Sequence, residues 1–152
     1  MKKKIILSVI LVGILVAAII FFGKTGKNAP ADNSSKADIV ITDNYFIEAT
    51  NDIYFNVDDY VGKTIFMEGY IYVYSDDEGV EHYAVVRNTP GCCGNDGLAG
   101  LDVSSENGYP EAGSWVEVTG ELKKDKINGY DTPVIYLTDM KQKEEGQSFV
   151  TN

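Results

Sequence analysis

Hydrophobic and polar residues alternate with a period of two over much of the second half of the chain, which is typical of half-buried β-strands. The longest such run covers residues 63–74, and a turn at 75–79 separates it from a second run at 82–87. The alternating apolar phase of the long run is Ile65, Met67, Gly69, Ile71 and Val73. These two runs predict a β-hairpin.

Three further strand-like runs cover residues 98–103, 115–122 and 134–137, and none of the five runs has helical periodicity. In the fourth run, Val116 and Val118 share the phase expected to point inward. Five antiparallel strands, of which the first is long and contains glycine and the others are short, indicate a small closed barrel. Glycine lets the long strand bend between the two halves of the barrel. The sequence therefore predicts an all-β, five-stranded OB-like barrel; a small open β-sandwich is the alternative.

A short strand at 38–42 and a helix at about 44–55 are expected to precede the barrel. The residues that lie at helical spacing are Phe46, Ala49, Thr50, Ile53 and Val57. Thr42, Asp43 or Asn44 is the expected N-cap, because short polar side chains accept hydrogen bonds from the first helical N–H groups.

The N-terminus carries a different pattern. Ile5–Phe22 is free of charged residues and follows Lys2–Lys4. In a helix, this run would span roughly 27 Å, close to the thickness of a bilayer's hydrocarbon core. It predicts a single-pass anchor with the lysines in the cytoplasm and the C-terminal bulk outside. A cleaved signal peptide is the alternative, since Ala29-Pro30-Ala31 has the form of a cleavage site.

Composition divides the chain into four parts: an anchor at 1–23, a flexible linker at 24–37, an extracytoplasmic domain at 38–142 and a polar tail at 143–152. Residues 38–152 hold seven basic and twenty-two acidic side chains, a formal charge of −15. Such a surface should repel nucleic acid, which needs a basic footprint. We expect the N-terminal helix to bind the membrane, and we expect no nucleic-acid partner.

The two cysteines of the chain, Cys92 and Cys93, are adjacent and lie between Gly91 and Gly94 rather than in an apolar strand. Paired thiolates select soft metal ions such as zinc or copper. Two further ligands are available in Asp96 and in His82, the only histidine. The alternatives are a redox-active or strained adjacent disulfide, favoured by an oxidising compartment, and a structural turn with inert thiols.

A second candidate site is an aromatic binding surface. Its members, Phe66, Tyr70, Tyr72 and Trp115, share the outward phase of their strands. Aromatic side chains on barrel strands can stack ligands, although cross-strand packing explains the same pattern. The sequence contains no Ser-His-Asp set and no phosphate-binding loop, so we expect a protein that is not an enzyme.

Six short motifs occur in order between residues 39 and 141: Tyr60-Val61-Gly62-Lys63, Glu68-Gly69-Tyr70-Ile71-Tyr72, Val85-Val86-Arg87, Cys92-Cys93-Gly94-Asn95-Asp96, Trp115-Val116-Glu117-Val118-Thr119-Gly120 and Thr132-Pro133-Val134-Ile135. This set resembles the C-terminal domain of the YcgQ-like family of permease accessory subunits, most specifically through Cys-Cys-x-x-Asp. The resemblance implies an OB-like extracytoplasmic domain and a membrane permease as partner. Together these patterns predict a membrane-tethered accessory domain that binds a metal or docks to a transporter; a thiol-disulfide redox component and an aromatic binding module are the alternatives.

Overall fold

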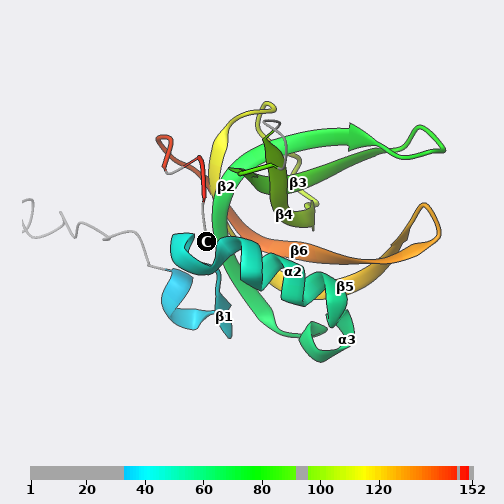
Figure 1. Cartoon of the computed structure of the whole chain (residues 1–152), viewed down its shortest axis with the longest axis horizontal. Coiled ribbons are helices and arrows are strands. Elements are labelled where there is room, and N and C mark those ends of the chain that lie inside the picture. The colour runs from blue at the N-terminus through cyan, green and yellow to red at the C-terminus, as the bar shows by residue number, and fades with distance from the viewer. Residues whose placement is uncertain (1–32, 92–95, 147, 151–152) are drawn as a thin grey trace, which may run out of the picture. The chain divides into compact units, whose positions relative to one another are not determined.

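The computed structural model describes residues 33–91, 96–146 and 148–150 (Figure 1). Their secondary-structure elements are, in order, a 3₁₀ turn Asn33–Lys36, β1 Ile39–Val40, a 3₁₀ turn Asp43–Tyr45, α2 Phe46–Phe55, α3 Val57–Tyr60, β2 Thr64–Ser75, β3 Glu81–Thr89, β4 Gly97–Ser104, β5 Trp115–Ile127 and β6 Tyr130–Gln142. The expectation of an all-β domain preceded by a short strand and a helix is confirmed.

The predicted membrane anchor, Ile5–Phe22, lies outside the described residues. Within the part of the chain that the structure describes, none of the helices is both long enough and apolar enough to cross a bilayer.

Strands β2 to β6 close into a barrel. The sheet runs in the order β1-β2-β3-β4-β6-β5, and an additional pairing between β2 and β5 joins its ends. Closure leaves each barrel strand with two neighbours over at least part of its length. This strand order is OB-like. The structure is a barrel and not the open β-sandwich that was the alternative prediction.

Two details of the barrel differ from the sequence prediction. Strands β4 and β6 pair in parallel, with Val103 opposite Ile135, whereas five antiparallel strands were expected. Strands β5 and β6 are each 13 residues long and meet at the short turn Asn128-Gly129. The alternation in 123–127 and 130–133 was obscured by lysine and aspartate, because the outer halves of these strands extend into solvent.

Gly69 allows β2 to serve both sides of the barrel. The first half of β2 pairs with β5 from Thr64 to Tyr70, and the second half pairs with β3 from Tyr70 to Ser75. A Cβ atom at Gly69 would lie 2.6 Å from the carbonyl oxygen of Val86, closer than a side chain permits. The glycine is therefore needed for the close approach of two backbones.

Helix α2 packs against the barrel through one face, formed by Phe46, Thr50 and Ile53. The helix begins at Phe46, without a side-chain hydrogen bond from either Thr42 or Tyr45 to the first turn. The predicted N-cap is therefore not formed. Asp43 instead pairs with Arg87 of β3.

The core lies inside the barrel and under α2. Its buried members are Ile41, Phe46, Ile53, Ile65, Met67, Ile71, Val85, Leu101, Val103, Val116, Val118, Leu122, Ile135 and Val150. The inward phase predicted for β2 and β5 is confirmed, because Ile65, Met67, Val116 and Val118 are all fully buried. Each large apolar side chain that leaves water contributes about 1.5–3 kcal/mol to folding.

The C-terminal segment is part of the fold rather than a detached polar tail. The backbone N–H of Asn88 donates to Ser148 at 2.8 Å, the N–H of Val150 donates to Asn88 at 2.9 Å, and Val150 is fully buried. Gly146 lies against the Trp115 ring, because a Cβ atom there would come within 2.8 Å of the ring. The segment thus covers Trp115, the only tryptophan of the chain.

Replacing Gly146 by valine should lift this segment from Trp115. The added side chain has no room against the indole, and overpacking of this kind costs about 1–3 kcal/mol. We expect a lower urea midpoint and a red-shifted tryptophan emission. Glu145→Val, a change at an exposed neighbouring position, should leave both unchanged. An unshifted emission in Gly146→Val would contradict the packing described for this segment.

Candidate functional site

The cysteine-bearing connection joins two fixed strand ends. Cys92 and Cys93 lie outside the described residues, but β3 ends at Thr89 and β4 begins at Gly97, and these two residues are paired. Asn88 is held from three sides: its side chain accepts a hydrogen bond from Tyr70 at 2.7 Å, and its backbone bonds to the C-terminal segment. The loop therefore starts from a rigid base.

The structure separates two of the residues expected to assist the cysteines. Asp96 is exposed and immediately precedes β4, beside the base of the loop. His82 lies at the other end of β3, and the seven residue steps from His82 to Thr89 cover roughly 23 Å of extended strand. His82 is thus not placed to share a metal ion with Asp96.

His82 already has partners of its own. Its Nε2 lies 2.9 Å from a carboxylate oxygen of Asp76, and its ring stacks on Tyr74. The hydrogen bond with His82, helped by the backbone N–H groups of Val80 and Glu78, lowers the pKa of the Asp76 carboxyl. This cluster stabilises the turn between β2 and β3. In the described residues, no three His, Cys, Asp or Glu side chains are grouped so as to hold a metal ion.

The predicted aromatic surface is only partly exposed. Phe66 and Trp115 are buried, the latter under the C-terminal segment, and Tyr70 is half-buried with its hydroxyl bound to Asn88. Tyr72 alone among the four is open to solvent, with 40% of its surface exposed. The sequence pattern showed the phase of these side chains correctly but not the segments that cover the outer face of the barrel.

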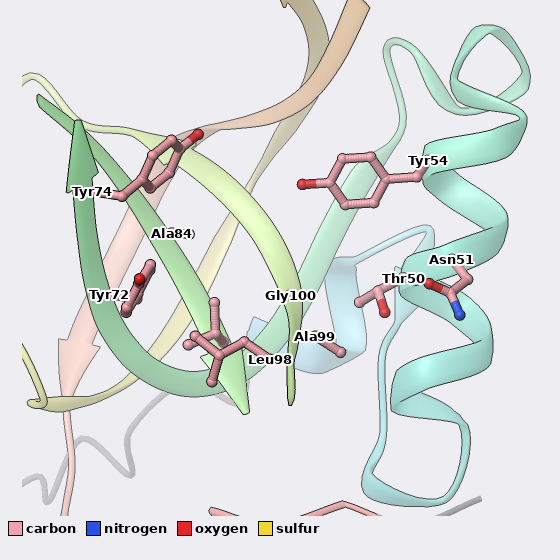
Figure 2. A pocket seen from close by; sticks show the side chains of 10 residues that line it. Thr50, Asn51, Tyr54, Tyr72, Tyr74, Ala84, Leu98, Ala99 and Gly100 are labelled. Atoms are coloured by element: carbon pink, nitrogen blue, oxygen red, sulfur yellow. The ribbon is translucent and has the colours of Figure 1, made fainter. Parts of the chain in front are cut away.

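A pocket of about 320 Å³ opens between α2 and the outer face of the barrel (Figure 2). Tyr54 points from α2 toward the sheet, and Tyr72 and Tyr74 of β2 lie on the opposite side. Leu98 and Gly100 of β4 complete the wall on the strand side. The pocket brings Tyr72 together with residues that the sequence analysis did not single out.

Asp102 of β4 is bound to two tyrosines that line this pocket. The hydroxyl of Tyr74 donates to one carboxylate oxygen at 2.7 Å, and the hydroxyl of Tyr54 donates to the other at 3.2 Å. Asp102 is only 5% exposed. Burial raises the pKa of the Asp102 carboxyl, and the two tyrosine hydrogen bonds oppose this rise. Burial and the neighbouring carboxylate raise the pKa of both tyrosines, so both remain protonated donors.

One sequence signal for this site was available. Asp102 is a single carboxylate within the run Gly97–Ser104, which otherwise has no charged residue. If such a charged side chain is buried, it requires a hydrogen-bonding or charged partner. Tyr54 gave no comparable signal, because the exposed face of a helix commonly carries tyrosine.

These features define a small all-β domain with OB-like strand order, a loop that carries two cysteines and an aromatic pocket on its outer face. The chain belongs to the DUF1980 C-terminal domain family, whose model matches residues 22–150.

No curated protein matches the chain. Among solved structures, the N-terminal domain of PriB protein from Thermoanaerobacter tencongensis is 16% identical, with a TM-score of 0.32, over 54% of this chain and 97% of that one. A similarity of this size is too low to indicate a shared function.

Proposed function

We propose that this protein is a membrane-tethered, extracytoplasmic accessory domain that binds a soft metal ion, zinc or copper, through Cys92 and Cys93. The observation that carries the proposal is the location of the adjacent cysteines in the connection between two paired strand ends, Thr89 and Gly97. A rigid base lowers the entropy lost when two thiolates are brought to one ion.

The N-terminal sequence supports the tether. Lys2–Lys4 followed by Ile5–Phe22 is typical of a single-pass anchor with the C-terminal domain outside the cytoplasm. The resemblance to YcgQ-like permease accessory subunits supports a membrane permease as the partner to which the cysteine loop docks.

The available ligands suit a site for capture and transfer. Two thiolates and the exposed carboxylate of Asp96 provide three donors, one fewer than the four of a closed structural zinc site. An open coordination position can be filled by water or by a ligand from a partner. We leave His82 out of this set, because it lies at the other end of β3 and is paired with Asp76.

Thiol-disulfide chemistry is the second candidate, because thiols outside the cytoplasm tend to oxidise. Adjacent cysteines can close a bond only with strain, and strained disulfides are readily reduced. A redox component would be isolated without metal and would take up two hydrogens on reduction.

Metal content distinguishes the two candidates. Full-length protein purified under anaerobic, reducing conditions should retain one zinc or copper ion per chain through desalting. Cys92→Ser and Cys93→Ser should each abolish retention, because a single thiolate with one carboxylate is a weak soft-metal ligand set. Asp96→Asn should weaken metal affinity by roughly tenfold or more while the metal-free protein keeps its melting temperature.

His82→Gln serves as the matched control, since it removes a metal-binding side chain at the other end of β3 and should leave metal content unchanged. Metal-free wild-type protein with a two-thiol mass change on reduction would favour the redox candidate. Equal metal content in wild type and all cysteine variants would refute the site.

A further inference from the structure

We propose that the pocket between α2 and the barrel is a binding site for an organic cation, an ammonium group carried by a small molecule or by a lysine side chain. The proposal is independent of the cysteine loop. It rests on the shape of the pocket, on the aromatic rings that line it and on the buried carboxylate bound to two of them.

The rim of the pocket exposes large apolar side chains from three different elements. Tyr54 is 42% exposed, Tyr72 is 40% exposed and Leu98 is 46% exposed. These residues come from α2, β2 and β4 and line one pocket. Exposed apolar residues gathered around a concave site mark a binding surface more strongly than the same residues scattered singly. The volume of about 320 Å³ suits a small ligand or a single side chain.

The polar groups of the pocket favour a positively charged ligand. Tyr54 and Tyr74 each donate their hydroxyl hydrogen to Asp102. Their hydroxyl oxygens can therefore only accept a hydrogen bond from a ligand. Donation to a carboxylate also makes these oxygens better acceptors. The residues that line the pocket in the described structure include no lysine or arginine.

The tyrosine rings of the pocket and the negative charge of the domain both favour a cationic ligand. A cation placed over a tyrosine ring is attracted by the ring's electron-rich face, and the attraction grows as water is excluded. The formal charge of −15 on residues 38–152 raises the local concentration of cations and disfavours anions. An anionic or nucleic-acid ligand would find no counter-charge here.

Isothermal titration calorimetry with the full-length chain tests the proposal. Three probes are needed: choline, its neutral isostere 3,3-dimethylbutan-1-ol, and the blocked peptide acetyl-Gly-Lys-Gly-amide. We expect both cations to bind and the neutral isostere to bind at least tenfold more weakly, because shape is kept while charge is removed. Tighter binding of choline than of the peptide identifies a free ammonium ligand, and the reverse identifies a protein side chain.

Variants locate the binding. Asp102→Asn keeps the size of the side chain and removes its charge, and should weaken choline binding by roughly tenfold. Tyr72→Leu keeps apolar volume and removes the ring, and should weaken it by roughly 3- to 30-fold. Tyr130→Leu makes the same change at an exposed position outside the pocket and should have no effect. Equal binding of choline and the isostere, no binding of either cation, or unchanged affinity in folded Asp102→Asn and Tyr72→Leu would each overturn the proposal.

Discussion

Val118→Asp is expected to unfold the barrel. Val118 is fully buried in the core and lies on β5, opposite Met67 of β2 and Met140 of β6. A carboxylate placed there would lose its water and find only apolar neighbours, because Met67, Val116 and Leu122 surround the same interior. The cost is about 3–5 kcal/mol or more, a large part of the total stability of a small domain.

Circular dichroism and urea unfolding of the full-length chain measure this effect. Val118→Ala should unfold cooperatively at a lower urea concentration, since it removes apolar volume without burying a charge. Val80→Asp introduces the same carboxylate at an exposed position in the turn before β3 and should change stability by less than about 1 kcal/mol. A native far-ultraviolet spectrum and an unchanged midpoint for Val118→Asp would show that β5 does not face the core.

The inward faces of β2 and β5 were predictable because alternation of large apolar residues is a local signal. Ile65, Met67, Val116 and Val118 needed only the period of two to be placed correctly. The outer halves of β5 and β6 were not predictable in this way. There, Lys123 and neighbouring charged residues lie on strands that extend beyond the core, so the pattern that marks a strand is lost.

Long-range contacts decided the remaining differences. The parallel pairing of β4 with β6 depends on how the chain returns across the barrel, and strand sequences of this length do not encode direction. Trp115 was expected on the outer face of its strand, but Gly146, which covers its ring, follows 31 residues later in the sequence. Burial of an outward residue by a distant segment has no local signature.

The candidate sites also contain features that a local sequence signal predicted and features that only long-range contacts decided. The cysteine pair could be recognised as chemically distinctive from the sequence alone, since it is set among glycine and proline rather than in the apolar alternation of a strand. Whether His82 assists it depended on how far β3 extends, and β3 runs from Glu81 to Thr89, which places the histidine at the end of the strand away from the loop. The pocket required Tyr54, Tyr74 and Asp102 to converge from three elements, which only the fold brings about.

Arg87→Ala is expected to destabilise the domain nearly as much as Val118→Asp. The Arg87 side chain is 3% exposed, and its guanidinium lies 4.8 Å from the centre of the Phe46 ring and 5.1 Å from that of Trp115. Its Nε donates to the backbone carbonyl of Glu68 at 2.8 Å, and a terminal nitrogen donates to Asp43. One side chain thus joins the first residue of α2, the middle of β2 and the first residue of β5.

Removing this side chain leaves a cavity beside two rings and a carbonyl without its donor, for a total cost of about 3–5 kcal/mol. Arg87→Lys should recover little of this loss, because a compact ammonium group cannot contact two rings while donating to two acceptors as the guanidinium does. Asp43→Asn should cost less than about 1 kcal/mol, since 49% of the Asp43 side chain is exposed and the pair is partly screened by water.

Urea midpoints of these three variants test the assignment, and metal retention extends the test to the cysteine loop. Arg87 lies two residues before the end of β3, so its loss should loosen the strand end from which the loop begins. We therefore expect Arg87→Ala to lower metal affinity even where the protein remains folded, whereas Asp43→Asn should preserve it. Wild-type stability in Arg87→Lys would show that charge, rather than the contacts of the guanidinium with the Phe46 and Trp115 rings, is what this position requires.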